Sequence, residues 1–105
     1  MKTQSGLTRY DFLADAGELL RGQREADYGD ARINISRYAV MMSIVLNAEI
    51  TPVQAALSLV SLKLSRLASP TISFEAAVDS ILDAISYLAI AGELLAVENS
   101  EANNV

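Results

Sequence analysis

The segment ITPVQAALSLVSLKLSRLAS, residues 50–69, limits the fold of this chain more narrowly than any other. Thr51 is a favoured helix cap, Pro52 suits the first helical position, and Gln54 completes a capping box. Apolar residues then recur at helical spacing along one side: Val53, Ala56, Leu57, Val60, Leu64 and Leu67. The segment therefore predicts a helix that starts at residue 52 and buries one face.

Three other segments carry helix signals. Thr8 with Asp11 three residues later is close to a capping box, and Ser73 is a suitable cap for a last helix. Between them, the stretch YAVMMSIVL is apolar on almost every side, which is typical of a central or interfacial helix. We therefore expect further helices over residues 8–24, 32–47 and 74–97.

The connections between these helices are short. READYGD, residues 24–30, predicts a turn because Gly29 and its flanking acids favour one, and SPTIS, residues 69–73, breaks the helix before it. Short connections between four helices predict an all-α fold, a compact bundle of about four helices. We expect a flexible N-terminus over 1–7, a single helical domain over 8–97 and a disordered polar tail over 98–105.

The apolar content is high for so short a chain. Of the 105 residues, 51% are hydrophobic, and the mean hydropathy is +0.27. A small domain leaves much of its surface exposed, so one small core does not comfortably hide this content. A core shared between subunits is therefore expected, and the chain is predicted to be a homo-oligomer.

Composition also excludes several classes of function. The net charge of −5 argues against nonspecific binding to nucleic acid. The chain has no cysteine and no histidine, so any metal would be a hard cation such as Mg²⁺ or Mn²⁺ held by oxygens. We expect no membrane segment, because the uncharged run over residues 38–48 is too short to span a bilayer. Without a signal peptide, the expected location is the cytoplasm.

An acidic stripe marks the expected last helix. Glu75, Asp79, Asp83 and Ser86 fall on one side of it, and Tyr87 lies at the border of the stripe. No Lys or Arg follows residue 73 to offset these acids locally. The stripe is consistent with a divalent-cation site at Asp79 and Asp83, with salt bridges to another helix, or with the wet face of an amphipathic helix.

The basic residues are clustered too. Lys63 and Arg66 are three residues apart on a helix without acids, so they point the same way. Such a pair suits a phosphate, and it equally suits neutralisation of Asp79 and Asp83 across the bundle. Tyr28, within the predicted turn, offers a ring for stacking or a hydroxyl for hydrogen bonding.

Taken in order, four motifs resemble a known series: DYG at 27–29, Asn34, KLSR at 63–66 and DSILDAISYL at 79–88. The series resembles small phage and prophage helical domains of unknown function, and it is similar to a nucleotide-modification-associated phage domain. More distantly it resembles the MazG-type all-α nucleoside triphosphate pyrophosphohydrolases. Those enzymes hold Mg²⁺ with two acidic pairs. Here only Asp79 and Asp83 match a pair, because Lys63 and Arg66 stand where the other would be.

The resemblance implies a protein that binds a nucleotide or cyclic nucleotide, in the cytoplasm of an infected bacterium. Lys63 and Arg66 would contact phosphate, Tyr28 would contact base or sugar, and Asp79 and Asp83 would orient those cations or a Mg²⁺ ion. Asn34 and Tyr87 complete the expected ligand site, and no catalytic residue is assigned. Sequestration of a nucleotide signal of host defence is the leading hypothesis. The alternatives are a Mg²⁺-dependent pyrophosphohydrolase and a non-enzymatic inhibitor of a host protein.

Overall fold

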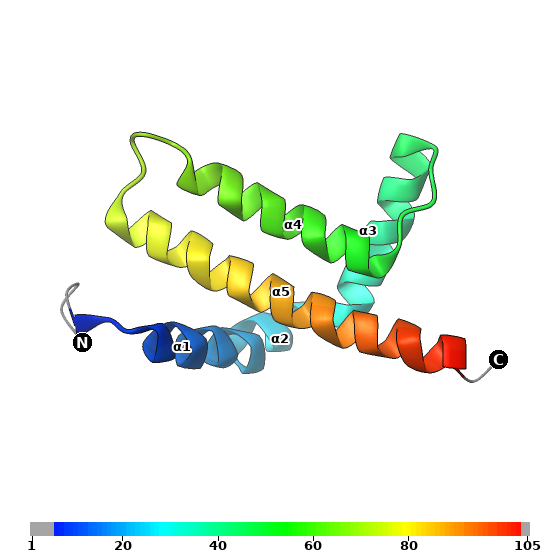
Figure 1. The fold of residues 1–105 in the computed structure, drawn as a ribbon, viewed down its shortest axis with the longest axis horizontal. Helices are drawn as coiled ribbons and strands as arrows, with labels where there is room; N and C mark the ends of the chain where they lie inside the picture. Colours follow the sequence, from blue (N-terminus) through cyan, green and yellow to red (C-terminus); the bar gives the residue numbers. More distant parts are fainter. Residues whose placement is uncertain (1–5, 104–105) are drawn as a thin grey trace.

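Two long antiparallel helices carry the rest of the structure. The computed structural model describes residues 6–103, apart from the side chains of Gln23, Arg24 and Tyr28. Helices α4 (Pro52–Leu67) and α5 (Phe74–Asn103) run side by side, joined by a short loop (Figure 1). Their packing is the most extensive helix–helix contact in the described chain.

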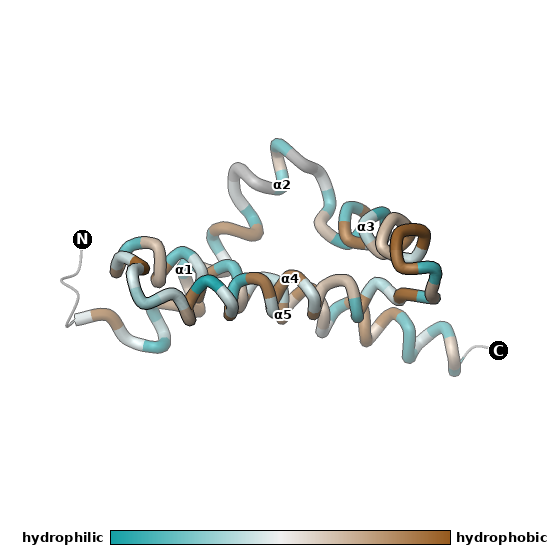
Figure 2. Tube along the Cα trace, turned by 90° about the horizontal axis from the view of Figure 1, so that it is seen from above, coloured by the Kyte–Doolittle hydropathy of each residue, from teal (hydrophilic) through white to brown (hydrophobic). Residues whose placement is uncertain are grey.

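The remaining helices lie against this pair. Helix α1 (Arg9–Arg21) packs on α5, and the short α2 (Gln23–Tyr28) leads into α3 (Ala31–Leu46), which packs mainly on α4. Helices α2 and α3 lie on one side of the α4–α5 layer (Figure 2). The predicted all-α bundle is therefore confirmed, with a short extra helix and no strand in residues 6–103.

Local capping chemistry sets the helix starts, as the sequence predicted. Thr8 and Asp11 form a capping box at α1, and Thr51 and Gln54 form another at α4. At α5, the Ser73 hydroxyl oxygen accepts a hydrogen bond from the backbone N–H of residue 76, at 3.1 Å. These side chains bind backbone N–H groups that have no partner within the first helical turn.

Two helix ends differ from the sequence-based expectation. Helix α1 ends before Gly22, and residues 23–28 form the further helix α2. The turn predicted over residues 24–30 is therefore confined to Gly29, with φ +78°, and Asp30. The last helix continues to Asn103, so the expected disordered tail is wrong for residues 98–103, and 104–105 lie outside the described residues. Polar residues alone do not end a helix, because extending an existing one costs little.

The core is small and rich in alanine. Its buried members come from α3, α4 and α5: Ile35, Ala39, Ala55, Ala56, Ile90, Ala91 and Leu94. Small side chains let the helix backbones approach closely. The bundle is nevertheless elongated, with extents of 50 × 28 × 25 Å and a radius of gyration of 15.6 Å, against about 13 Å for a compact domain of this length.

We predict that Thr51→Ala lowers the free energy of unfolding by about 1 kcal/mol, because it removes the N-cap of α4. Urea denaturation followed by circular dichroism measures the change. Thr71→Ala, in the exposed loop between α4 and α5, is the matched control and should change stability by less than about 0.5 kcal/mol. Equal effects of the two substitutions would contradict the assigned role of the cap.

Candidate functional site

A buried ion pair joins α4 to α5. The Nζ of Lys63 lies 2.9 Å from Oδ2 of Asp83, and only 13% and 11% of these two side chains are exposed. The antiparallel packing of the two helices places the residues opposite each other. The sequence left several roles open for these residues, and the structure shows that the Lys63 ammonium neutralises the Asp83 carboxylate across the bundle.

Such a pair fixes helix register more than it adds stability. Removing two charges from water is costly, and their attraction offsets that cost only when the geometry is good. A shifted α4 would leave the Asp83 carboxylate buried without the Lys63 ammonium. The pair therefore selects one alignment of the two helices.

Arg66 and Asp79 lie nearby but closer to solvent. Both are exposed, and with Asp83 they line a shallow hollow of about 350 Å³ near the loop between α4 and α5. The acidic stripe is thus divided. Glu75 and Asp79 face water, whereas Asp83 and Ser86 are buried, and the Ser86 hydroxyl donates to the carbonyl of residue 82.

The expected metal ligands lie beside a cation. A divalent ion at Asp79 and Asp83 would have to share the Asp83 carboxylate with the Lys63 ammonium, and the two positive charges repel each other. Among residues 6–103, no three His, Cys, Asp or Glu side chains are grouped so as to hold a metal ion. A Mg²⁺ site here would need ligands from beyond this cluster.

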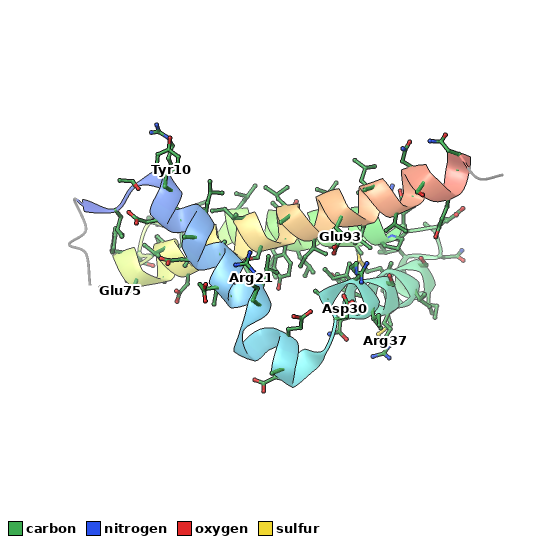
Figure 3. The ribbon with its side chains drawn as sticks, turned by 90° about the horizontal axis from the view of Figure 1, so that it is seen from below. Tyr10, Arg21, Asp30, Arg37, Glu75 and Glu93 are labelled. Atoms are coloured by element: carbon green, nitrogen blue, oxygen red, sulfur yellow. The ribbon has the colours of Figure 1, made fainter. Side chains whose placement is uncertain are left out.

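A cavity of about 580 Å³ opens where α1, α2, α3 and α5 meet, and we call it the main cavity because side chains from several helices line it. Its apolar walls include Leu20, Ile35 and Ile90. Its polar lining comes from two tyrosines, an amide, a hydroxyl and several charged groups: Tyr38, Tyr87, Asn34, Ser86, Arg21, Glu25, Asp30 and Glu93. Figure 3 shows Arg21, Asp30 and Glu93 on the same side of α5, whereas Arg37 points away from it.

A charge network ties one rim of the main cavity together. The Nη2 of Arg32 lies 2.8 Å from Oδ2 of Asp30, and its Nε lies 3.5 Å from Oε1 of Glu93. Arg32 therefore connects the start of α3 to α5. The hydrogen bond from the Arg32 side chain holds the pKa of Asp30 below its usual value, and the same bond raises the pKa of Arg32. Asp30 also accepts from the backbone N–H of Arg32 and caps α3.

The structure therefore divides the predicted ligand residues between two places. Asn34 and Tyr87 line the main cavity, whereas Lys63, Arg66, Asp79 and Asp83 belong to the α4–α5 contact and its hollow. Tyr28 ends α2 beside the cavity residue Gly29, but its side chain lies outside the described part.

Sequence reasoning missed Arg21, Tyr38 and Glu93, which also line the main cavity. Tyr38 begins an apolar run and reads as core from its neighbours alone. Arg21 and Glu93 look like ordinary surface charges on their own helices. A usable signal for Tyr38 is the polar hydroxyl that it places at the start of the apolar run YAVMMSIVL, since a tyrosine suits a position where one end is apolar and the other meets water.

We predict that Lys63→Met lowers the free energy of unfolding by about 3–5 kcal/mol, because it leaves a buried carboxylate without its cation. The double substitution Lys63→Met with Asp83→Leu should recover most of the loss. Urea denaturation measures both, and Arg66→Met, at an exposed position of α4, is the control and should change little. A small effect of Lys63→Met would show that the pair contributes little to the fold.

We predict that the Asp30 carboxyl titrates below the usual aspartate range when followed by NMR. Its folded pKa is depressed, so its contribution to stability is present at neutral pH and is lost as the pH falls through that lowered pKa. Arg32→Gln removes the main cause and should return the pKa toward its usual value. An unchanged titration in Arg32→Gln would contradict this assignment.

Comparison with known families matches residues 11–95 to a domain of unknown function, DUF6378. No curated protein and no solved structure matches the chain. The predicted resemblance is confirmed at the level of a domain of unknown function, while the phage and MazG-type resemblances stay predictions. The matched segment spans most of the chain and includes both the Lys63–Asp83 pair and the main cavity. The chain therefore belongs to the DUF6378 family.

Proposed function

We propose that this protein binds a nucleotide or cyclic nucleotide, with the base in the main cavity. The observation that carries the proposal is the cavity's lining, in which Tyr38, Tyr87 and Asn34 stand among apolar walls. Its volume of about 580 Å³ falls within the range of about 300–1,000 Å³ that is usual for small-molecule sites. Mostly apolar walls with a few polar groups suit a flat ring that carries hydrogen-bonding edges.

The lining offers both parts of base recognition. The tyrosine rings provide faces for stacking, and base–aromatic stacking contributes about 1–3 kcal/mol per base in other proteins. An asparagine amide has a donor and an acceptor on one planar group, so Asn34 can pair with a base edge. The tyrosine hydroxyls are suited to the sugar.

The charges decide which way the ligand points. Glu25, Asp30 and Glu93 line the main cavity with Arg21, and Arg32 is engaged by Asp30 and Glu93. A phosphate inside the cavity would be repelled by the three carboxylates. We therefore place the phosphates at the mouth, toward Arg21, which is exposed at the end of α1.

This arrangement gives Lys63 a different role from phosphate contact. Its ammonium is held by Asp83 in the α4–α5 contact, so it positions α5, which carries Ser86 and Tyr87 one turn further along. Binding of this kind would be sufficient to sequester a nucleotide signal of host defence, as the phage resemblance implies. Pyrophosphohydrolysis would additionally require a metal site.

We predict that one member of a panel of nucleosides, nucleotides and cyclic dinucleotides raises the melting temperature. A ligand at one hundred times its Kd stabilises the native state by about 2.7 kcal/mol, which is roughly 10 °C or more for a domain of this size. The panel is run with and without Mg²⁺. A flat response across the panel would overturn the proposal, and release of pyrophosphate would show a hydrolase.

Variants locate the site of any binding seen. Asn34→Ala and Tyr87→Leu should each weaken binding at least tenfold by calorimetry, whereas Tyr10→Leu, an exposed tyrosine of α1 outside the cavity, should not. Circular dichroism verifies that each variant folds. Tyr87→Phe keeps the ring and separates stacking from hydroxyl contact. If Arg66→Met weakened binding and Asn34→Ala did not, the ligand would lie at the hollow on α4 and α5 instead.

A further inference from the structure

Helix α5 carries an apolar stripe that the rest of the described chain covers only in part. We call it the α5 seam, and its members are spaced four and three residues apart in alternation: Phe74, Val78, Ile81, Ile85, Leu88, Gly92 and Leu95. Phe74, Ile81, Leu88 and Leu95 are exposed, with Leu88 at 50% and Leu95 at 57%, and Val78 and Ile85 are half-buried. No charged residue falls within the seam.

The seam lies opposite the face that packs on α4. The buried members of that inner face include Ser80, Asp83, Ile90 and Leu94, which alternate with the seam along the helix. A repeat of seven residues with two apolar positions is the pattern by which one helix packs along another. Helix α5 therefore carries a further apolar face besides the surfaces that pack on α4 and α1.

Gly92 gives a second and independent indication. A glycine inside a helix costs about 1 kcal/mol relative to alanine. A Cβ built at Gly92 would meet nothing within 4 Å, so the chain's own packing does not require a glycine there. A glycine on a helix face lets another backbone approach closely.

The molecule as a whole exposes more surface than a compact monomer of its mass, and an interface would bury part of that surface. The accessible surface is 7380 Å² for a chain of 11.3 kDa. A folded monomer of that mass exposes about 5,700 Å² by the usual scaling, so roughly 1,650 Å² is in excess. A standard interface buries about 800 Å² on each partner.

We propose that the α5 seam packs against the α5 seam of a second copy, antiparallel, about a two-fold axis near residues 84 and 85. In this register Ile81 meets Leu88 of the partner chain and Phe74 meets Leu95. Val78 fills the space over Gly92, whereas a parallel pairing would place the two glycines together and leave a void. Antiparallel helices also oppose their dipoles favourably.

A membrane suits the seam less well than a second copy does, and the exposed side of α3 is a weaker candidate for the interface. Helix α5 is long and apolar enough to cross a membrane by length and composition alone, but 44% of its most apolar window is buried within the fold. The exposed side of α3 is also apolar, with Val40, Met41, Ile44 and Val45, but Arg37 interrupts its stripe. The seam is longer, has no charge, and contains the glycine.

Sedimentation equilibrium from 1 to 100 µM tests the interface. The wild-type chain should behave as a dimer, and Gly92→Leu and Leu88→Glu should make it monomeric with unchanged helicity. Gly92→Leu is the sharper variant, because leucine favours a helix and its Cβ would have no atom of the described chain within 4 Å. Val45→Glu, at 80% exposure on α3, is the matched control and should stay dimeric.

Cross-linking tests the orientation, since the chain has no cysteine of its own. Ile81→Cys mixed with Leu88→Cys should form a disulfide between the two variants, and Ile81→Cys alone should not. Three outcomes would overturn the proposed interface: a wild-type monomer at 100 µM, a dimer that survives Gly92→Leu, or dissociation only by Val45→Glu. Flotation of the wild-type chain with phosphatidylcholine–phosphatidylglycerol vesicles, if Leu88→Glu abolished it, would also overturn the interface and show a membrane surface instead. A disulfide between two Ile81→Cys chains would overturn the antiparallel register.

Discussion

The contact between α4 and α5 organises this molecule, and the Lys63–Asp83 pair fixes its alignment. Two fully buried alanines near the start of α4, Ala55 and Ala56, let the backbones lie close but offer little shape to define a register. Similar apolar surfaces can slide past one another at small cost, whereas a buried carboxylate separated from its cation is costly. The Lys63–Asp83 pair thus specifies the register of α4 against α5, which a core of small side chains leaves undefined.

The main cavity depends on that alignment. Ser86 and Tyr87 follow Asp83 by about one turn, so the register of α5 decides where they stand relative to Asn34 and Tyr38 on α3. The Arg32 network then joins α3 to α5 at the rim through Glu93. In the proposed binding function, Lys63 and Asp83 would influence the ligand only through the helix that they position.

The small core and the large exposed apolar surface have one common origin. A chain of 105 residues with 51% hydrophobic residues cannot hide all of them inside an elongated bundle of this shape. The long helix α5 therefore carries apolar residues on two sides, one toward α4 and one outward. The proposed pairing of two α5 seams would bury the outward side by the same means as the inner one.

The sequence by itself determined the helices and most of their limits, because a cap such as Thr51 or Ser73 acts on backbone groups within a few residues of itself. It also determined which residues are charged on each helix, including both members of the Lys63–Asp83 pair as candidates. Tertiary structure alone decided that these two meet while Arg66 and Asp79 stay near water, and that Arg21, Asn34 and Tyr87 share a cavity. Those relations depend on how helices far apart in the chain cross, and helical periodicity fixes only the face of each helix.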